Sequence, residues 1–111
     1  MELDQMLVVT TDEVAGHRIT RVHGQVYGLT VRSRNMFSDI GAGLRGLVGG
    51  EVKGYTKLLG STRDEAITRL SEAARQMGAN AVVGMRYAGS DVAANTTEIV
   101  AYGTAVTIHR A

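Results

Sequence analysis

Two arginines, a tyrosine and a glutamate are the side chains of this sequence best suited to hold a ligand. Arg32 and Arg34 lie two residues apart, and Glu98 opens a long apolar stretch. Guanidinium groups bind carboxylates and phosphates, and a phenol such as that of Tyr55 both donates and accepts hydrogen bonds. We therefore take Arg32, Arg34, Tyr55 and Glu98 as candidate ligand-binding residues.

Among the acidic residues, Glu98 is the strongest candidate for a functional carboxylate, because it stands at the start of an apolar strand. An ion pair with Arg86 or Arg32 is the simpler interpretation. The adjacent carboxylates Asp64 and Glu65 would fit the first turn of a helix capped at Ser61 or Thr62. No serine or threonine lies in a nucleophile-elbow pattern. We predict no catalytic residues, and keep an enzyme built on Glu98 and arginines at a subunit junction as an alternative.

The histidines offer a second alternative, a divalent-metal site. His17 and His23 could act together with Asp12 or Glu13, with ligands completed across subunits. The spacing does not place two histidines on one face in a close His-x-His pattern. Soft heavy metals prefer thiolates, and the sequence has no cysteine. Metal ligation is therefore not our first hypothesis, and no cofactor is assigned.

Residues 41–46 match the G-x-G-x-x-G pattern of dinucleotide sites. That pattern works when it directly follows a buried strand and opens a helix within a βαβ unit. The sequence of the preceding residues 34–39 does not have the pattern expected of a buried strand. Close backbone packing is the better interpretation of these glycines.

Composition excludes several classes of protein. The chain has 111 residues, a formal net charge of +1 and 44% apolar residues. Nucleic-acid binding is disfavoured, because no basic patch is interleaved with aromatic residues. No apolar run approaches the roughly 20 residues of a membrane helix, and the acidic N-terminus is unlike a secretory signal. We expect a single cytoplasmic domain over residues 1–111.

Hydrophobic periodicity predicts strands around one long helix. The helical stripe keeps its phase from Val52 to Met77, which favours a helix from about residue 51 to 77 over one capped at Ser61 or Thr62. Gly78 is expected to end it. The other expected elements are strands at 6–11, 17–33, 79–87 and 97–109, a short glycine-rich helix at 39–50 and a polar loop at 89–95. The fold class is α+β, with an antiparallel or mixed sheet packed on the long helix.

The last expected strand predicts self-association. Between Glu98 and His109 it carries no charge, and both of its faces are apolar. One helix covers one face of a sheet, so another subunit is expected to cover the other. The alternative is that the segment around Leu44 covers that face within the monomer. A ligand or a partner protein would then bind at the surface or opening between subunits.

Several sequence blocks resemble one family. They are Gly49-Gly50-Glu51, Tyr55-Thr56, Ala66, residues 78–84 (GANAVVG) and residues 102–106 (YGTAV). The chain resembles the YbjQ-like family from about Leu7 to His109, a group of small bacterial proteins called "putative heavy-metal-binding". The resemblance implies a dodecin-like α+β fold and a homopentamer.

Overall fold

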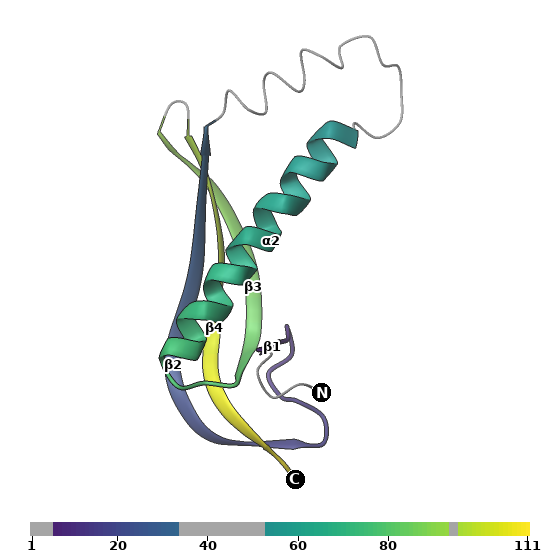
Figure 1. The fold of residues 1–111 in the computed structure, drawn as a ribbon, viewed down its shortest axis with the longest axis vertical. Helices are drawn as coiled ribbons and strands as arrows, with labels where there is room; N and C mark the ends of the chain where they lie inside the picture. Colours follow the sequence, from purple (N-terminus) through teal and green to yellow (C-terminus); the bar gives the residue numbers. More distant parts are fainter. Residues whose placement is uncertain (1–5, 34–52, 94–95) are drawn as a thin grey trace.

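A four-stranded sheet with one helix on one face makes up the described part of the chain (Figure 1). The structure is a computed structural model, and it describes residues 6–33, 53–93 and 96–111. Its elements are β1 (Leu7–Val8), β2 (His17–Ser33), α2 (Lys53–Gln76), β3 (Ala81–Ala93) and β4 (Thr96–Arg110). The expected short helix at 39–50 and the glycine pattern at 41–46 lie outside the described residues.

The sheet is mixed, as expected for the α+β class. Its strand order is β1-β3-β4-β2. β4 pairs antiparallel with both β3 and β2, whereas β1 pairs parallel with β3. The helix α2 runs obliquely across one face of the sheet (Figure 1). Every long strand is thus a neighbour of β4, which lies at the centre of the sheet.

The strand bounds differ most from the sequence prediction in β1 and at the end of β3. β1 is only two residues long, although its pairing with β3 continues through Val9, whose N–H donates to Val82. The predicted polar loop at 89–95 is wrong for residues 89–93, which continue β3. Pairing with β4, for example Asp91 opposite Thr97, outweighs the low strand propensity of these exposed polar residues.

The single long helix is confirmed, and Ser61 and Thr62 are not caps. Both hydroxyls donate to the carbonyl of Leu58, at 3.0 and 2.7 Å, as happens inside a helix. Gly78 ends the helix with φ = 89°. Its N–H donates to Arg75 and that of Ala79 donates to Ala74, which is the hydrogen-bond pattern of a Schellman motif.

Small residues let helix and sheet backbones touch. A Cβ on Gly28 of β2 would collide with the main chain of Ala66 and Leu70 in α2. Ala66 and Leu70 have no exposed surface. The glycine therefore sets the distance between helix and strand, in line with the tight packing expected from a glycine-rich chain. The core between the two layers consists of Val26, Ala66, Leu70, Ala74, Ala79, Val82, Met85, Ala101 and Ala105.

Asn80 joins the helix end to the centre of the sheet. Its Nδ2 donates to the carbonyl of Ile108 at 2.9 Å, and its Oδ1 accepts from the N–H of Ile108 at 2.8 Å. The side-chain amide thus pairs with the β4 main chain as another strand would. The GANAVVG block is explained physically by this contact, by the Gly78 cap and by the buried Ala79 and Ala81.

The sheet curls at the ends of β2 and β4 that lie near the termini (Figure 1). The pairing of β2 with β4 shifts register between Ile19 and Arg21 and again between Val22 and Gly24, where Gly24 has φ = 124°. Such bulges bend a strand and increase its twist. The curl brings residues of the N-terminal segment against the second face of β4.

Candidate interaction surface

The sheet face turned away from α2 is apolar and partly uncovered. Val26, Gly28 and Thr30 of β2 are buried on the helix side, so strand alternation places the residues between them on the other side. We call this surface the open face. Its members are Tyr27, Leu29 and Val31 of β2, Ala88 of β3, and Val100 and Tyr102 of β4.

Large apolar side chains on the open face meet solvent in the monomer. Tyr27 is 60% exposed, Val31 47% and Tyr102 38%. Leu29 and Val100, directly opposite each other, are half-buried. These side chains belong to two neighbouring strands and form one continuous stripe. A contiguous exposed apolar stripe is typical of an interaction surface.

Only part of the last strand lacks cover, which corrects the sequence prediction. Val106 and Ile108 were expected to need a neighbouring subunit. They are 1% and 5% exposed, because the chain itself covers them. The covering residues come from the N-terminal segment and the start of β2, and they are Leu7, Val9, Val14 and Ile19. The sheet curl makes this contact possible, and Tyr102 lies beyond its reach.

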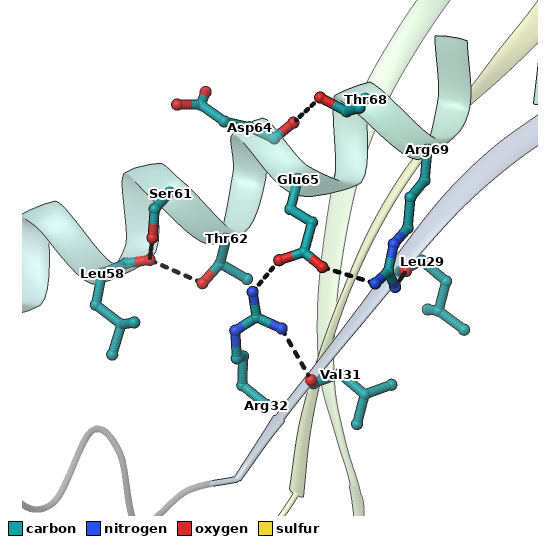
Figure 2. A network of polar contacts seen from close by, with 10 residues as sticks. All are labelled: Leu29, Val31, Arg32, Leu58, Ser61, Thr62, Asp64, Glu65, Thr68 and Arg69. Carbon is teal, nitrogen blue, oxygen red and sulfur yellow. Dashed lines mark hydrogen bonds and ion pairs between the residues drawn. The ribbon is translucent and has the colours of Figure 1, made fainter. Parts of the chain in front are cut away.

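On the helix side, one carboxylate is clamped between two arginines (Figure 2). Glu65 of α2 accepts from Arg32 of β2 through one oxygen and from Arg69, one helical turn on, through the other at 2.6 Å. The hydrogen bond from Arg32 holds the pKa of Glu65 below its ordinary value of 4.5, and the charges of Arg32 and Arg69 act in the same direction. The cluster ties the helix to strand β2.

Each arginine of this cluster also covers a carbonyl of β2. Arg69 donates to Leu29 and Arg32 donates to Val31 (Figure 2). Nothing in the local sequence links Arg32 to Glu65, which is 33 residues away, so sequence reasoning missed Glu65. By contrast, the i,i+4 spacing of Glu65 and Arg69 indicates from the sequence alone that these two side chains can form an ion pair on one helix.

The predicted ion pair of Glu98 with Arg32 or Arg86 does not form. Glu98 lies opposite Val31 in the open-face row of side chains, whereas Arg32 is on the helix side and binds Glu65. Arg86 donates to the carbonyls of Thr10 and Met85 instead. Glu98 is half-buried, as expected for an acid that opens an apolar strand.

The other candidate residues are not brought into one site. Arg34 lies outside the described residues, and of Tyr55 the structure describes only the backbone, in the first turn of α2. Arg32 and Glu98 point to opposite faces of the sheet. Within the described part of the chain, the candidates therefore do not form a single ligand site.

The histidines make separate local contacts. Nδ1 of His17 lies 2.9 Å from the carbonyl of Ala15, and Nε2 of His23 lies 2.7 Å from Oγ1 of Thr107. His17 lines an open hollow of about 890 Å³ formed by residues 11–19, together with Asp12 and Glu13. Among the described residues, however, no three histidine or acidic side chains converge as metal ligands.

Comparison with known proteins decides the family. The family described as "Putative heavy-metal-binding" matches residues 6–109. The chain belongs to this family. The resemblance noted in the sequence is thereby confirmed. In the residues that the structure describes, no helix is long and apolar enough to cross a membrane.

Relatives in this family share about half of their residues with the chain. A UPF0145 protein of Lactococcus lactis subsp. cremoris is 52% identical over 97% of this chain and 99% of its own length. One from Streptomyces coelicolor is 55% identical over 95% and 99%. One from Thermoplasma volcanium is 50% identical over 96% and 88%. The family thus extends to archaea, and the expected restriction to bacteria is too narrow.

A solved structure shares the fold. It is a protein of unknown function of the DUF74 family from Pediococcus pentosaceus, with a TM-score of 0.62 and 18% identity. The match covers 94% of this chain and 98% of that one. At this identity the likeness supports the fold alone.

Proposed function

We propose that the protein is a non-catalytic binding module that works as a closed homo-oligomer. The observation that supports this proposal most strongly is the open face, where Tyr27, Val31 and Tyr102 remain exposed on one sheet surface. Covering such a stripe with a second copy removes apolar surface from water at about 25 cal/mol per Å². A ring of five subunits is the assembly that the family resemblance implies.

The dimensions of the subunit support assembly. The radius of gyration of its Cα atoms is 17.1 Å, and its extents are 55 × 29 × 21 Å. A compact domain of about 100 residues has a radius of gyration near 13 Å. An elongated subunit with one long sheet leaves more surface exposed than a globule does. Association with neighbours restores the missing burial.

The binding role is proposed for the surface that assembly creates. Arg32, Arg34, Tyr55 and Glu98 remain our candidates for contact with a small ligand or partner protein. Arg32 and Glu98 stand on rigid strands of the sheet, and neither is deeply buried. Repeating these charges around a closed ring would give a ligand several equivalent contacts.

Heavy-metal binding, which the family description names, is not supported by the donor set. The sequence has no thiolate, and soft metals prefer sulfur ligands. Among the described residues, each of the two candidate histidines already faces an oxygen of its own chain. We therefore derive no function through a metal.

The proposal is tested by light scattering on the protein and on two variants of Tyr102. Tyr102→Phe keeps the apolar face and should keep the oligomeric mass. Tyr102→Glu places a charge on that face and should shift the mass toward the subunit's 11.8 kDa. Circular dichroism of both variants confirms that the helix and sheet remain. If Tyr102→Glu leaves a large assembly intact, the open face is not the contact surface.

A further inference from the structure

Within the described residues, the sheet has no strand partner on the outer edge of β2 or on the part of the β3 edge beyond β1. We propose that the β2 edge of one copy pairs in parallel with the β3 edge of the next copy, around Tyr27 and Ala88. This inference rests on the proposed homo-oligomer and names the two strands that form its subunit contact, which we call the joint. Strand addition between copies supplies main-chain hydrogen bonds as well as side-chain contacts.

The contacts of two arginines show which main-chain N–H and C=O groups of β2 point away from β4. The carbonyls of Leu29 and Val31 accept from Arg69 and Arg32, so they point away from β4. The pairing of β2 with β4 has no shift from Gly24 to Ser33. Main-chain groups alternate along a strand, and the N–H and C=O of Gln25 and Tyr27 therefore point to the same free edge.

Access to this edge is open. Beside it lies a hollow of about 450 Å³, which Gln25, Val26 and Tyr27 share with helix residues. The helix residues are Ala73, Gln76 and Met77. Further along, the arginines already occupy two carbonyls, which is a known way to protect an edge from unwanted pairing. The available stretch is centred on Tyr27.

The described residues of the N-terminal segment cover the first part of the β3 edge. The N–H of Val9 donates to Val82, and the N–H groups of Gly84 and Met85 donate back to that segment. From Arg86 to Asp91 the pairing with β4 has no shift. Alternation from the outward N–H of Met85 places the N–H and C=O of Tyr87 and Gly89 on the free edge.

A second copy of this chain fits both edges at once. β2 and β3 run in the same direction, because each is antiparallel to β4. Rotation about a ring axis along the strands would bring β2 of one copy beside β3 of the next in parallel. Tyr27 would then bond to Tyr87 and Gly89 and lie opposite Ala88, and both side chains belong to the open face. The open face would continue from subunit to subunit, and a ring closed with this face inside would let neighbouring copies cover one another's apolar stripes.

Charge on the two edges is complementary. Among the described residues, Arg32 and Arg69 share a single carboxylate, Glu65, which leaves an excess positive charge beside β2. The β3 edge carries Asp91, which in the proposed register would lie opposite Thr30, two residues from Arg32 and on the same face of the sheet. A heterologous contact brings these charges together. A contact between two β2 edges would leave β3 unpaired.

Engineered cysteines test the joint, since the chain has none of its own. Neighbouring strands bring opposite residues within disulfide distance. The double variant Tyr27→Cys with Ala88→Cys should give a ladder of disulfide-linked multimers after mild oxidation. Each single variant should give none. Arg86→Cys or Ser90→Cys, each combined with Tyr27→Cys, reports a register displaced by two residues along the same edge.

Two results would overturn the inference while leaving the oligomer standing. One is an oligomeric mass without cross-linking in any of these double variants. The other is an efficient dimer from Tyr27→Cys alone, which would mean that two β2 edges meet. A monomeric mass of the unmodified protein would instead refute the proposed function itself. The two failures are therefore distinguishable.

A proline pair gives an independent test on the β3 side. Gly89→Ala keeps the outward N–H, and its Cβ would meet only the carbonyl of Glu98 at 3.5 Å, an ordinary contact. Gly89→Pro removes that N–H, and proline is tolerated on edge strands. We expect the alanine variant to keep the oligomeric mass and the proline variant to fall toward the monomer mass. An unchanged mass with proline contradicts the inference.

Discussion

Tyr27 of β2 lies directly opposite Tyr102 of β4, and both side chains stand exposed on the sheet face away from the helix. Aromatic side chains carry large apolar area and are enriched at interfaces between proteins. On the reverse face, the adjacent pair Gly28 and Ala101 is fully packed beneath α2. The same two strands thus have one face that α2 covers and one apolar face that is exposed to solvent in the subunit.

Gly28→Ala should destabilise the fold strongly. The added Cβ would meet the main chain of Ala66 and Leu70, and a helix backbone cannot rotate away as a side chain does. Overpacking of this kind costs about 1–3 kcal/mol. Urea unfolding followed by circular dichroism measures the loss. A variant as stable as the parent would show that helix and strand are not in close contact.

Gly60→Ala is the matched control and should act in the opposite direction. Gly60 lies within α2, is exposed, and has no atom within 4 Å of an added Cβ. Replacing an exposed helix glycine by alanine stabilises a helix by about 1 kcal/mol. Thermal unfolding should therefore shift upward. A downward shift would indicate that this part of the helix is packed against something.

Asn80→Ala should cost about 1–3 kcal/mol, because two hydrogen bonds with the main chain of Ile108 are lost. The loss should appear in the free energy of unfolding from denaturant titration. Thr68→Ala removes one exposed helix hydroxyl bond and serves as the control, with an expected change within about 0.5 kcal/mol. Equal effects of the two substitutions would contradict the bridging role of Asn80.

Glu65→Gln should lower stability at neutral pH and matter little in acid. The pKa of Glu65 is lowered in the folded protein, chiefly by the hydrogen bond from Arg32, so its contribution is present above 4.5. The contribution is lost as the pH falls through the lower, folded pKa. The melting temperatures of parent and variant should thus differ near pH 7 and converge in strong acid.

Asp64→Asn is the control for this pH dependence. The carboxylate of Asp64 points away from Arg32 and Arg69 (Figure 2). Its substitution leaves both arginine contacts of Glu65 in place. If the Glu65 and Asp64 variants showed the same pH dependence, the arginine clamp would not stabilise the fold.

Zinc or copper should not stabilise the protein. Thiolates are absent from the sequence, and the described histidines do not converge with acids. Untagged protein should carry well under one equivalent of metal, and added zinc should leave the melting temperature unchanged. A zinc-dependent rise that His17→Ala or His23→Ala abolishes would restore the metal hypothesis.

Local patterns in the sequence predicted the helix and the two long strands well. The stripe from Val52 to Met77 and the glycine at 78 define the helix, because periodicity and capping are local properties. The strand at 89–93 was missed because its polar residues resemble a loop. Its pairing with β4 is a tertiary effect that local composition does not contain.

The candidate site was harder to predict, because it depends on how the sheet curls. Alternation along β4 correctly showed two apolar faces. It could not show that Val9 and Val14 would fold beneath Val106 and Ile108, which leaves only the part around Tyr102 uncovered. Contacts such as Arg32 with Glu65 join distant segments, and no spacing rule links them.

Sedimentation velocity of the unmodified protein over a dilution series into the micromolar range shows whether the open face is covered in solution. A closed homo-oligomer should sediment as a single species of several times 11.8 kDa that persists on dilution. A species of 11.8 kDa throughout would contradict it, because the stripe from Tyr27 to Tyr102 would then meet water in solution.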